Sequence, residues 1–370
     1  MSRLKLLYII GQLRRGGAEQ QLYYLLQQLP DPAIVVSLEK DHPDTYWTEP
    51  MRALGHQVVE IPRRGSFDFG RIRVLTALIR REKPSIVHLF TDTPSGIYGR
   101  IACILAGQKY VVIGERRHPQ ADPRWYRLLK RYVLNSRVSA VIANAEASRQ
   151  FLIEQENLAP SRVHYIPNGI DLSRFQPAAN RTQPRGMLPE SWRDKKIVIN
   201  VGSLLPKKAP EVYVAVAKAV MDQYPEARFL HVGRGRLLQE VRALSEQLGL
   251  ADRLIFMGER TDIPDILHAC DLFVMTSRNE GTPNAAMEAM ATGLPCVLTD
   301  TGDCRTLIKD GSTGYVVPLD PTLLTDRIVQ LLRDDPARQA MGVQALQAIQ
   351  QYSIPRMAEQ YLNIYKSLAS

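Results

Sequence analysis

The stretch Arg278–Gly293, RNEGTPNAAMEAMATG, decides the fold of the second half of the chain. It follows a short apolar run, Leu272–Met275, which predicts a buried strand. Gly281–Asn284 then forms a tight turn, and an Ala/Met-rich helix follows it. Pro283 suits the first helical position, where an N–H group is not needed. A strand, a glycine turn and a helix in this order are typical of an α/β sheet.

Two glutamates flank the start of this helix, Glu280 in the turn and Glu288 in the helix. The first amides of a helix have no partner within it, and its positive dipole end attracts anions. A ligand that combines phosphates with hydroxyl groups, such as a nucleotide diphosphate sugar, would suit amides beside two carboxylates. The alternative is an ordinary strand–turn–helix with two solvated glutamates.

Length and composition indicate a globular protein of two domains. The chain has 370 residues, 45% of them hydrophobic and 23% charged. Its first apolar run, up to Ile10, is too short for a signal peptide or a membrane span. Cys103, Cys270, Cys296 and Cys304 have no metal-binding spacing, so we expect reduced core thiols. These features predict a cytoplasmic protein, which could also dock on the cytoplasmic face of the inner membrane.

The net charge of +9 is unevenly distributed. Residues 51–150 contain 18 Lys and Arg against 7 Asp and Glu, so the rest of the chain is slightly acidic. Nucleic acid could bind such a basic region, but we find no recognition motif for it and predict no nucleic-acid partner. An anionic membrane surface or a diphosphate-bearing acceptor is the partner that we expect.

Strand and helix patterns alternate along the whole chain, which predicts mostly parallel sheets covered on both faces. Functional residues of such sheets lie after the carboxyl ends of strands. Glycine-containing loops after strands include Gly16–Gly17 and Gly233. The Pro-rich run 176–193 predicts an interdomain linker. Expected strands are 4–10, 33–38, 57–61, 86–90, 110–113, 140–143, 197–201, 229–232, 254–257, 272–275 and 295–299; expected helices include 71–81, 96–105, 125–134, 146–155 and the tail from 354.

Several motifs together resemble the retaining glycosyltransferases of family 4, which have the GT-B fold. Glu280 and Glu288 stand at the glutamates of the family's Glu-x7-Glu motif, separated by the usual Gly-Thr-Pro-Asn loop. Gly16–Glu19 and Pro167–Asp171 also match family segments, and the resemblance covers nearly the full length. It implies an N-terminal acceptor-binding Rossmann-like domain (1–175), the linker (176–193), a nucleotide-sugar-binding Rossmann-like domain (194–352) and a helix (353–370) that returns to the first domain. The two sheets would face each other across a cleft.

The resemblance also implies roles for residues in the donor site. Glu288 would bind the ribose, Glu280 the donor sugar, and Lys208, helped by Lys207, the leaving diphosphate. Relatives have an arginine where this chain has Ser203 and a glycine where it has Ala209. Further donor-site positions are Gly16, Gly17, Ser203, Gly233, Thr261, Ile263, Gly281, Thr282, Pro283 and Asn284.

On the N-terminal domain, His88 matches the first histidine of a family His-x-His pair. Phe90 takes the place of the second, which is usually the one near the sugar. The resemblance makes His88 a candidate catalytic residue beside Glu280, Lys207 and Lys208. A histidine at a strand end is more often structural than catalytic, so whether His88 takes over the role of the second histidine stays open. Arg116 and Arg117 would contact the acceptor or the diphosphate. The basic amphipathic segment with Arg124, Arg127, Lys130 and Arg131 predicts either a solvated helix face or a membrane-docking surface.

The sequence therefore predicts a metal-independent glycosyltransferase that moves a hexose or N-acetylhexosamine, with retention of configuration. The donor would be a nucleotide sugar, with UDP the expected nucleotide. The acceptor would be a glycan or a polyprenyl-diphosphate-linked sugar in polysaccharide, lipopolysaccharide or glycolipid synthesis. No other cofactor is expected. A GT-B nucleotide-sugar epimerase and a non-catalytic scaffold protein with the same fold are the alternatives.

Overall fold

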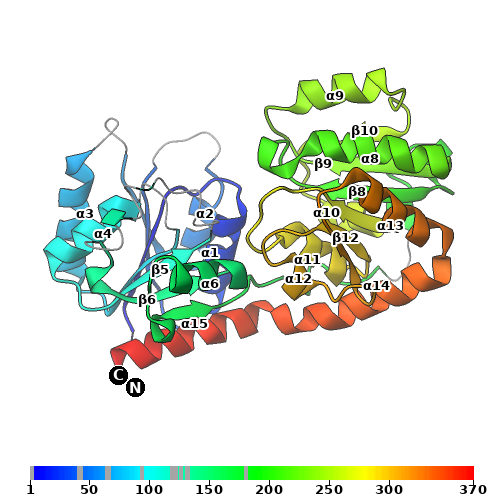
Figure 1. Cartoon of the computed structure of the whole chain (residues 1–370). Helices are drawn as coiled ribbons and strands as arrows, with labels where there is room; N and C mark the ends of the chain where they lie inside the picture. Colours follow the sequence, from blue (N-terminus) through cyan, green and yellow to red (C-terminus); the bar gives the residue numbers. More distant parts are fainter. Residues whose placement is uncertain are drawn as a thin grey trace. The chain divides into compact units, whose positions relative to one another are not determined.

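The chain forms two compact α/β units (Figure 1). The computed structural model describes residues 4–39, 45–62, 68–91, 96–116, 124, 128–129, 134–178 and 182–370. Unit 1 combines Met1–Gly169 with Ile354–Ser370, and unit 2 is Ile170–Ser353.

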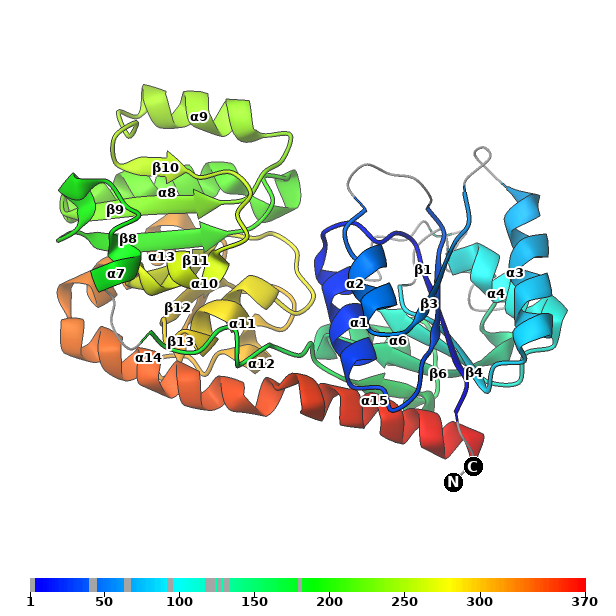
Figure 2. The same ribbon diagram turned by 180° about the vertical axis from the view of Figure 1, so that it is seen from behind.

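Unit 1 is built on a parallel sheet of seven strands in the order β3-β2-β1-β4-β5-β6-β7. Helices α1, α2 and α15 pack on one face of the sheet, and α3, α4 and α6 on the other (Figures 1 and 2). The bounds are β1 Leu6–Ile10, α1 Gly17–Gln27, β2 Ile34–Ser37, α2 Thr48–Ala53, β3 Gln57–Glu60, α3 Phe69–Glu82, β4 Ile86–Leu89, α4 Gly96–Ala106, β5 Val111–Glu115, β6 Val138–Ala143, α6 Glu146–Glu154, β7 Val163–Tyr165 and α15 Ile354–Ala369.

Unit 2 repeats this plan with six parallel strands in the order β10-β9-β8-β11-β12-β13. Helices α8, α9 and α13 cover one face, and α10, α11, α12 and α14 cover the other. The bounds are α7 Thr182–Arg185, β8 Lys196–Val201, α8 Pro210–Gln223, β9 Ala227–Val232, α9 Leu238–Gln247, β10 Leu254–Phe256, α10 Ile263–His268, β11 Leu272–Met275, α11 Asn284–Ala291, β12 Cys296–Thr299, α12 Cys304–Leu307, β13 Gly314–Val317, α13 Pro321–Arg333 and α14 Asp335–Ile349.

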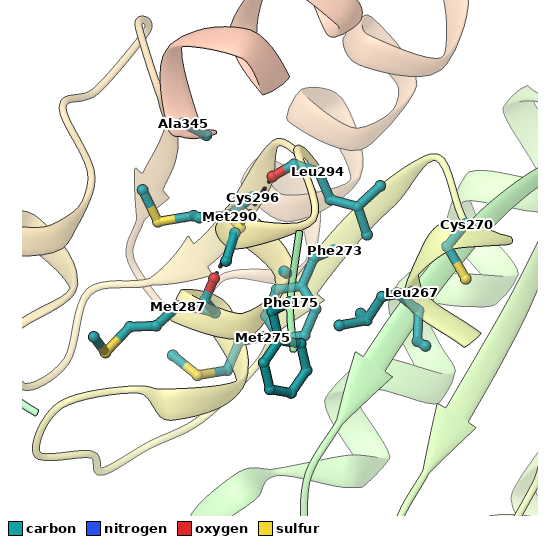
Figure 3. Packing of buried hydrophobic residues seen from close by; sticks show 14 of the residues in the cluster. Phe175, Leu267, Cys270, Phe273, Met275, Met287, Met290, Leu294, Cys296 and Ala345 are labelled. Carbon is teal, nitrogen blue, oxygen red and sulfur yellow. Dashed lines mark hydrogen bonds between the residues drawn. The ribbon is translucent and has the colours of Figure 1, made fainter. Parts of the chain in front are cut away.

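The strands of unit 2 are apolar on both faces because both faces are covered. In β11, Phe273 and Met275 point into the core beneath α11, while Leu272 and Val274 point into the opposite core. Figure 3 shows the first of these cores, where Met287 and Met290 of α11 lie over the sheet. The methionines and alanines of α11 thus pack the helix onto the sheet. Its first residues therefore lie close to the carboxyl end of β11.

Both sheets have a point where the order of the strands reverses. It lies between β1 and β4 in unit 1 and between β8 and β11 in unit 2. Ligands of open α/β sheets bind outside the carboxyl ends of the strands at such a point. The loops after β8 and β11 are therefore the first place to look for a site in unit 2.

The expected strands are all present, with ends within two residues of those predicted. Helix α11 starts at Asn284, so Pro283 is the residue before the helix and not its first residue. The expected helix 125–134 falls largely outside the described residues. Strands β7 and β13 were not predicted; both are short and lie at sheet edges.

Residues 170–193 are part of unit 2, which differs from the expected boundary at 175 and the expected linker 176–193. Phe175, Leu188 and Trp192 are buried in its core. The guanidinium of Arg185 also forms an ion pair of 2.7 Å with Asp271. The run lacks periodicity because it packs through single anchor residues.

The four cysteines are free and buried. Burial raises the pKa of the Cys103 and Cys304 thiols to about 12, so they are core residues, as predicted. No helix in the described part of the chain is both long enough and apolar enough to cross a membrane.

Trp192→Ala tests whether the 170–193 segment belongs to the core of unit 2. Trp192 is 2% exposed and donates a hydrogen bond from Nε1 to the carbonyl of Asp252. We expect the free energy of unfolding to fall by about 3–5 kcal/mol, measured by urea unfolding followed by circular dichroism. Met187→Ala, a change at an exposed residue of the same segment, is the control and should cost less than about 0.5 kcal/mol. Equal, small effects would show that the segment is a linker.

Candidate nucleotide-sugar site

The loops after β8 and β11 are joined by backbone hydrogen bonds. The carbonyl of Lys207 accepts the amide of Arg278 at 2.8 Å. The Thr276 hydroxyl donates to the carbonyl of Ala209 at 3.2 Å. Two segments about seventy residues apart are thus fixed to each other at the reversal point of the sheet.

Lys208 and Glu280 meet where these loops join. The Lys208 ammonium donates to Oε1 of Glu280, and the Ser277 hydroxyl donates to the same oxygen at 2.6 Å. The side chain of Glu280 is 10% exposed and that of Lys208 24%. Because the pair is partly buried, solvent and salt screen the attraction between its charges less than they would at the surface. This attraction helps to hold both side chains in their orientation. Ser277 was not predicted, because one serine after a strand carries no signal.

A third segment, the loop after β12, supports the Glu280 turn. Thr301 accepts the amide of Glu280 at 3.2 Å, and the amide of Asp303 donates to the carbonyl of Gly281 at 3.0 Å. A Cβ at Gly302 would lie 2.3 Å from that carbonyl oxygen, and its φ is +55°. Gly302 is therefore needed for this close approach. Thr301, Gly302 and Asp303 were not predicted as site residues, although Thr301 and Gly302 follow a predicted strand.

Glu288 lies one turn into α11. Neighbouring Met287 and Ala289 are buried in the core, whereas Glu288 is only half-buried. Loss of hydration raises the pKa of the Glu288 carboxyl to about 7, against the opposing positive charge of Arg174. The predicted binding residues Thr282, Pro283 and Asn284 are at the start of the same helix.

The other predicted donor-site residues lie on adjacent loops at the same edge of unit 2. Gly233 has a φ of +140°, and a Cβ there would lie 1.9 Å from the carbonyl oxygen of Gly202, next to Ser203. The Gly233 amide donates to the carbonyl of Gly258 at 2.7 Å. Thr261 lies in the loop after β10, as Gly258 does, and Ile263 is the first residue of α10. The structure thus brings the loops after β8, β9, β10 and β11 together.

In unit 1, the predicted Gly16–Gly17 loop follows β1 and leads into α1. A Cβ at Gly16 would lie 2.2 Å from the carboxylate of Glu19, so glycine allows this carboxylate to fold back on the loop. Burial raises the pKa of Glu19, while Gln12 and Arg116 act in the opposite direction. Glu19 supports the loop, a role that the sequence did not reveal.

His88 lies in the core of unit 1 and is not an open site residue. It is 1% exposed, and Nδ1 is 2.6 Å from the Tyr365 hydroxyl. Burial holds the pKa of His88 well below its usual range. Its ring lies close to those of Tyr8 and Tyr361. We therefore leave His88 out of the proposed catalytic residues.

Arg116 also has a structural function that explains Phe90. The guanidinium lies 4.0 Å above the Phe90 ring. It donates to Asn168 at 2.9 Å and to the Tyr361 hydroxyl at 2.7 Å. The Phe90 ring offers an uncharged aromatic face, which attracts the arginine cation. Arg116 thus connects α15 to the segment that follows β7. Its expected contact with the acceptor stays a prediction.

The predicted membrane-side residues are mostly outside the described part of the chain. Arg117, Arg127, Lys130 and Arg131 fall there, and Arg124 is exposed. The expectation for this segment stays a prediction.

A cavity of about 600 Å³ in unit 1 lies at the amino ends of β1, β4 and β5. Its basic side chains, Arg80, Lys83 and Lys109, lie by the carboxyl ends of α3 and α4. Cations stabilise the negative dipole ends of helices, which accounts for them. Because ligands of such sheets bind at the opposite edge, we do not include this cavity in the site.

Comparison with known proteins agrees with this architecture. Residues 15–174 match the family model "Glycosyltransferase Family 4", and residues 189–348 match "Glycosyl transferases group 1". A lipopolysaccharide core biosynthesis mannosyltransferase of Rhizobium meliloti is 31% identical over 266 residues, 69% of this chain and 70% of the relative. An Escherichia coli UDP-Gal:α-D-GlcNAc-diphosphoundecaprenol α-1,3-galactosyltransferase is 31% identical over 255 residues, which span 66% of this chain and 65% of that protein.

Among solved structures, Anabaena HepE in complex with UDP and glucose superimposes with a TM-score of 0.85 at 22% identity, covering 99% of this chain and all of that one. Two Rossmann-like units in one chain are typical of the GT-B class of glycosyltransferases. This chain belongs to family 4 of that class.

Gly302→Ala should loosen the Glu280 turn. The added methyl would clash with the carbonyl oxygens of Gly281 and Glu280, so amide hydrogen exchange should increase across residues 277–284. Gly311→Ala is the matched control, because φ is also positive (+73°) but nothing lies within 4 Å of the new Cβ. Both variants should lose about 1–2 kcal/mol of stability from backbone strain. Unchanged exchange at 277–284 in Gly302→Ala would refute the supporting role.

Glu288→Gln should stabilise the protein at pH 8 more than at pH 5. The pKa of Glu288 is about 7 in the folded protein, above the ordinary value of 4.5. Its contribution to stability is complete below pH 4.5 and is lost as the pH rises through 7. The neutral amide of glutamine does not ionise, so the Glu288→Gln variant does not lose this stability at high pH. Thermal unfolding at both pH values measures the difference. Glu240→Gln, an exposed change on α9, should show no such trend; an equal trend would mean that Glu288 is not the source.

Proposed function

We propose that the protein is a retaining glycosyltransferase that moves a hexose or an N-acetylhexosamine from a UDP-sugar to a glycan or a polyprenyl-diphosphate-linked acceptor. The observation that carries the proposal is the Lys208–Glu280 pair, held between two loops at the start of α11. A cation, a helix start and two carboxylates at one edge fit a ligand with phosphates, ribose and sugar.

The leaving group needs the most stabilisation. Breaking the bond between the sugar and the diphosphate builds negative charge on the leaving oxygens, and fixed positive groups lower that barrier most. Lys208 and the exposed Lys207 provide charge, and the start of α11 provides amides and a positive dipole end. These groups would supply the positive charge that relatives obtain from an arginine at the position of Ser203.

The diphosphate would compete with Glu280 for Lys208. Phosphate oxygens draw the ammonium toward the leaving group, and the carboxylate of Glu280 can then accept hydroxyls of the donor sugar. Ser277 keeps Glu280 oriented during this exchange, since it donates to Oε1 independently of Lys208. Glu288, in its ionised form, accepts the ribose hydroxyls.

The acceptor hydroxyl would attack from the side on which the diphosphate leaves, and a phosphate oxygen would take its proton. The configuration of the sugar is then retained. Charge stabilisation by Lys208 and the helix start supports a reaction without a divalent ion. Within the described residues no group of three or more His, Cys, Asp or Glu could hold a metal ion.

The names of relatives support the choice of substrates. The E. coli relative uses UDP-Gal and a diphosphoundecaprenol-linked acceptor, and the R. meliloti relative acts in lipopolysaccharide core synthesis. Residues 51–150 carry the basic excess of this chain, which suits docking to an anionic surface on the cytoplasmic face of the inner membrane. No observation favours the epimerase or the scaffold protein.

UDP should stabilise the wild type against thermal unfolding more than ADP, GDP or CDP does. A ligand at about 100 times its Kd adds about 2.7 kcal/mol. Lys208→Ala and Glu288→Ala should lose most of this shift, because they remove the phosphate cation and the ribose acceptor. Lys218→Ala, which breaks an exposed ion pair on α8, should keep it. If no nucleotide diphosphate stabilises the wild type, the donor-site proposal fails.

A further inference from the structure

Helices α3 and α4 lie side by side on one face of the unit 1 sheet (Figures 1 and 2). Their ends are also linked, because Nη2 of Arg80 donates to the carbonyl of Leu105 at 2.6 Å. The inward residues of both helices belong to one apolar core, so their outward residues share an outer surface. We call this the α3–α4 surface, and the exposed residues that define it are Arg73, Val74, Arg80, Arg81, Leu105 and Lys109.

The α3–α4 surface exposes apolar side chains where a solvated helix face is usually polar. Val74 is 48% exposed, and Leu105, in the last turn of α4, is 53% exposed. Phe69, the first residue of α3, is 74% exposed and lies one turn before Arg73 on the same side of the helix. A single exposed apolar residue is common. Several of them interspersed with arginines are typical of a helix face at a lipid interface.

The charged residues of the α3–α4 surface are all arginine or lysine. Among the described residues 69–82 and 96–110, Glu82 is the only acidic one. Its carboxylate accepts hydrogen bonds from Lys5 and from Arg81, each at 2.8 Å. The Glu82 charge is thus already matched by cations within unit 1. The α3–α4 surface therefore complements an anionic partner.

The helix dipole does not account for all of these cations. Arg80 and Lys109 lie at the carboxyl ends of α3 and α4, where a positive charge is favourable. Arg73 lies in the amino-terminal half of α3, and the first turn of this helix contains no acidic residue. A cation at this position gains nothing from the dipole, which favours negative charge at that end. An anion outside the chain would give Arg73 a favourable interaction.

We propose that the α3–α4 surface docks on an anionic lipid bilayer. Its arginines would bind the lipid phosphates, while Val74 and Leu105 enter the boundary between head groups and acyl chains. A guanidinium binds phosphate oxygens through two parallel hydrogen bonds, and the apolar stem of arginine suits this boundary. This inference rests on the proposed function, because an acceptor on a polyprenyl diphosphate is held in a membrane by its hydrocarbon chain.

The test measures co-sedimentation of the full chain with vesicles of phosphatidylcholine alone and of phosphatidylcholine mixed with an equal amount of phosphatidylglycerol. The wild type should bind the mixed vesicles and not the neutral ones, and added salt should weaken the binding. The double variant Arg73→Gln/Arg81→Gln should bind about 25-fold more weakly, because each arginine near an anionic membrane contributes about fivefold. Its control, Arg242→Gln/Arg327→Gln, removes the same charge from exposed positions of unit 2 and should bind as the wild type does.

The double variant Val74→Ser/Leu105→Ser tests the apolar contact. It should bind the mixed vesicles at least about fivefold more weakly, because it removes apolar groups from the bilayer boundary. Leu323→Ser/Val343→Ser changes the same residue types at exposed positions of unit 2 and should keep the affinity of the wild type. All these substitutions are at exposed residues, so thermal unfolding of the variants should match that of the wild type.

The proposal would be overturned if the wild type bound neither kind of vesicle, or both kinds alike. Surface variants that bind as well as the wild type would contradict it, and so would equal losses in a variant and its control. A second copy of the chain is the other occupant that an apolar face could have. A dimer of the wild type in sedimentation velocity that Val74→Ser/Leu105→Ser dissociates would show that the face is an interface between copies.

The vesicle assay contains no nucleotide, so its result is independent of the donor site. Thermal shifts with UDP should be the same in the wild type and in the four double variants. If the wild type binds the mixed vesicles through the α3–α4 surface but binds no nucleotide diphosphate, the donor-site proposal is the part that fails. If UDP binds but the vesicles do not, the docking surface is the part that fails.

Discussion

The site in unit 2 depends on the joining of the loops after β8 and β11. These strands are neighbours in the sheet, and their carboxyl ends meet where the strand order reverses. Hydrogen bonds from Arg278 and Thr276 to the backbone of the first loop then bring Lys208 to Glu280. Without this joining, a lysine and a glutamate far apart in sequence would be separate surface charges.

The loops around Lys208 and Glu280 contain backbone conformations that lower the stability of the fold. Gly302 and Gly233 permit backbone approaches that no larger residue allows, and Ala209 adopts a left-handed conformation with a φ of +46°. Loss of hydration disfavours the charged form of the Glu288 carboxyl and raises its pKa. A protein retains such features where a ligand benefits from groups that are already in place.

The sequence predicted the fold well because periodic apolar strands are a strong signal, and β11 was located to the residue. The family resemblance also predicted Glu280, Lys208 and Glu288 in one site. It could not show that Ser277 and Thr301 support Glu280, since these contacts depend on which loops meet. His88 shows the reverse error: a histidine on a strand looked functional, but α15, far along the chain, covers it with Tyr365. Residues 176–193 were predicted to be a linker because isolated anchors such as Leu188 and Trp192 have no periodicity.

A crystal structure of the protein with UDP would show whether the nucleotide binds at the joined loops of unit 2. We expect the ribose hydroxyls within about 3.2 Å of the Glu288 carboxylate, the outer phosphate at the ammonium of Lys208, and the loop after β10 along the uracil. UDP bound at another edge of unit 2, or with its phosphates away from Lys208 and the start of α11, would contradict this expectation.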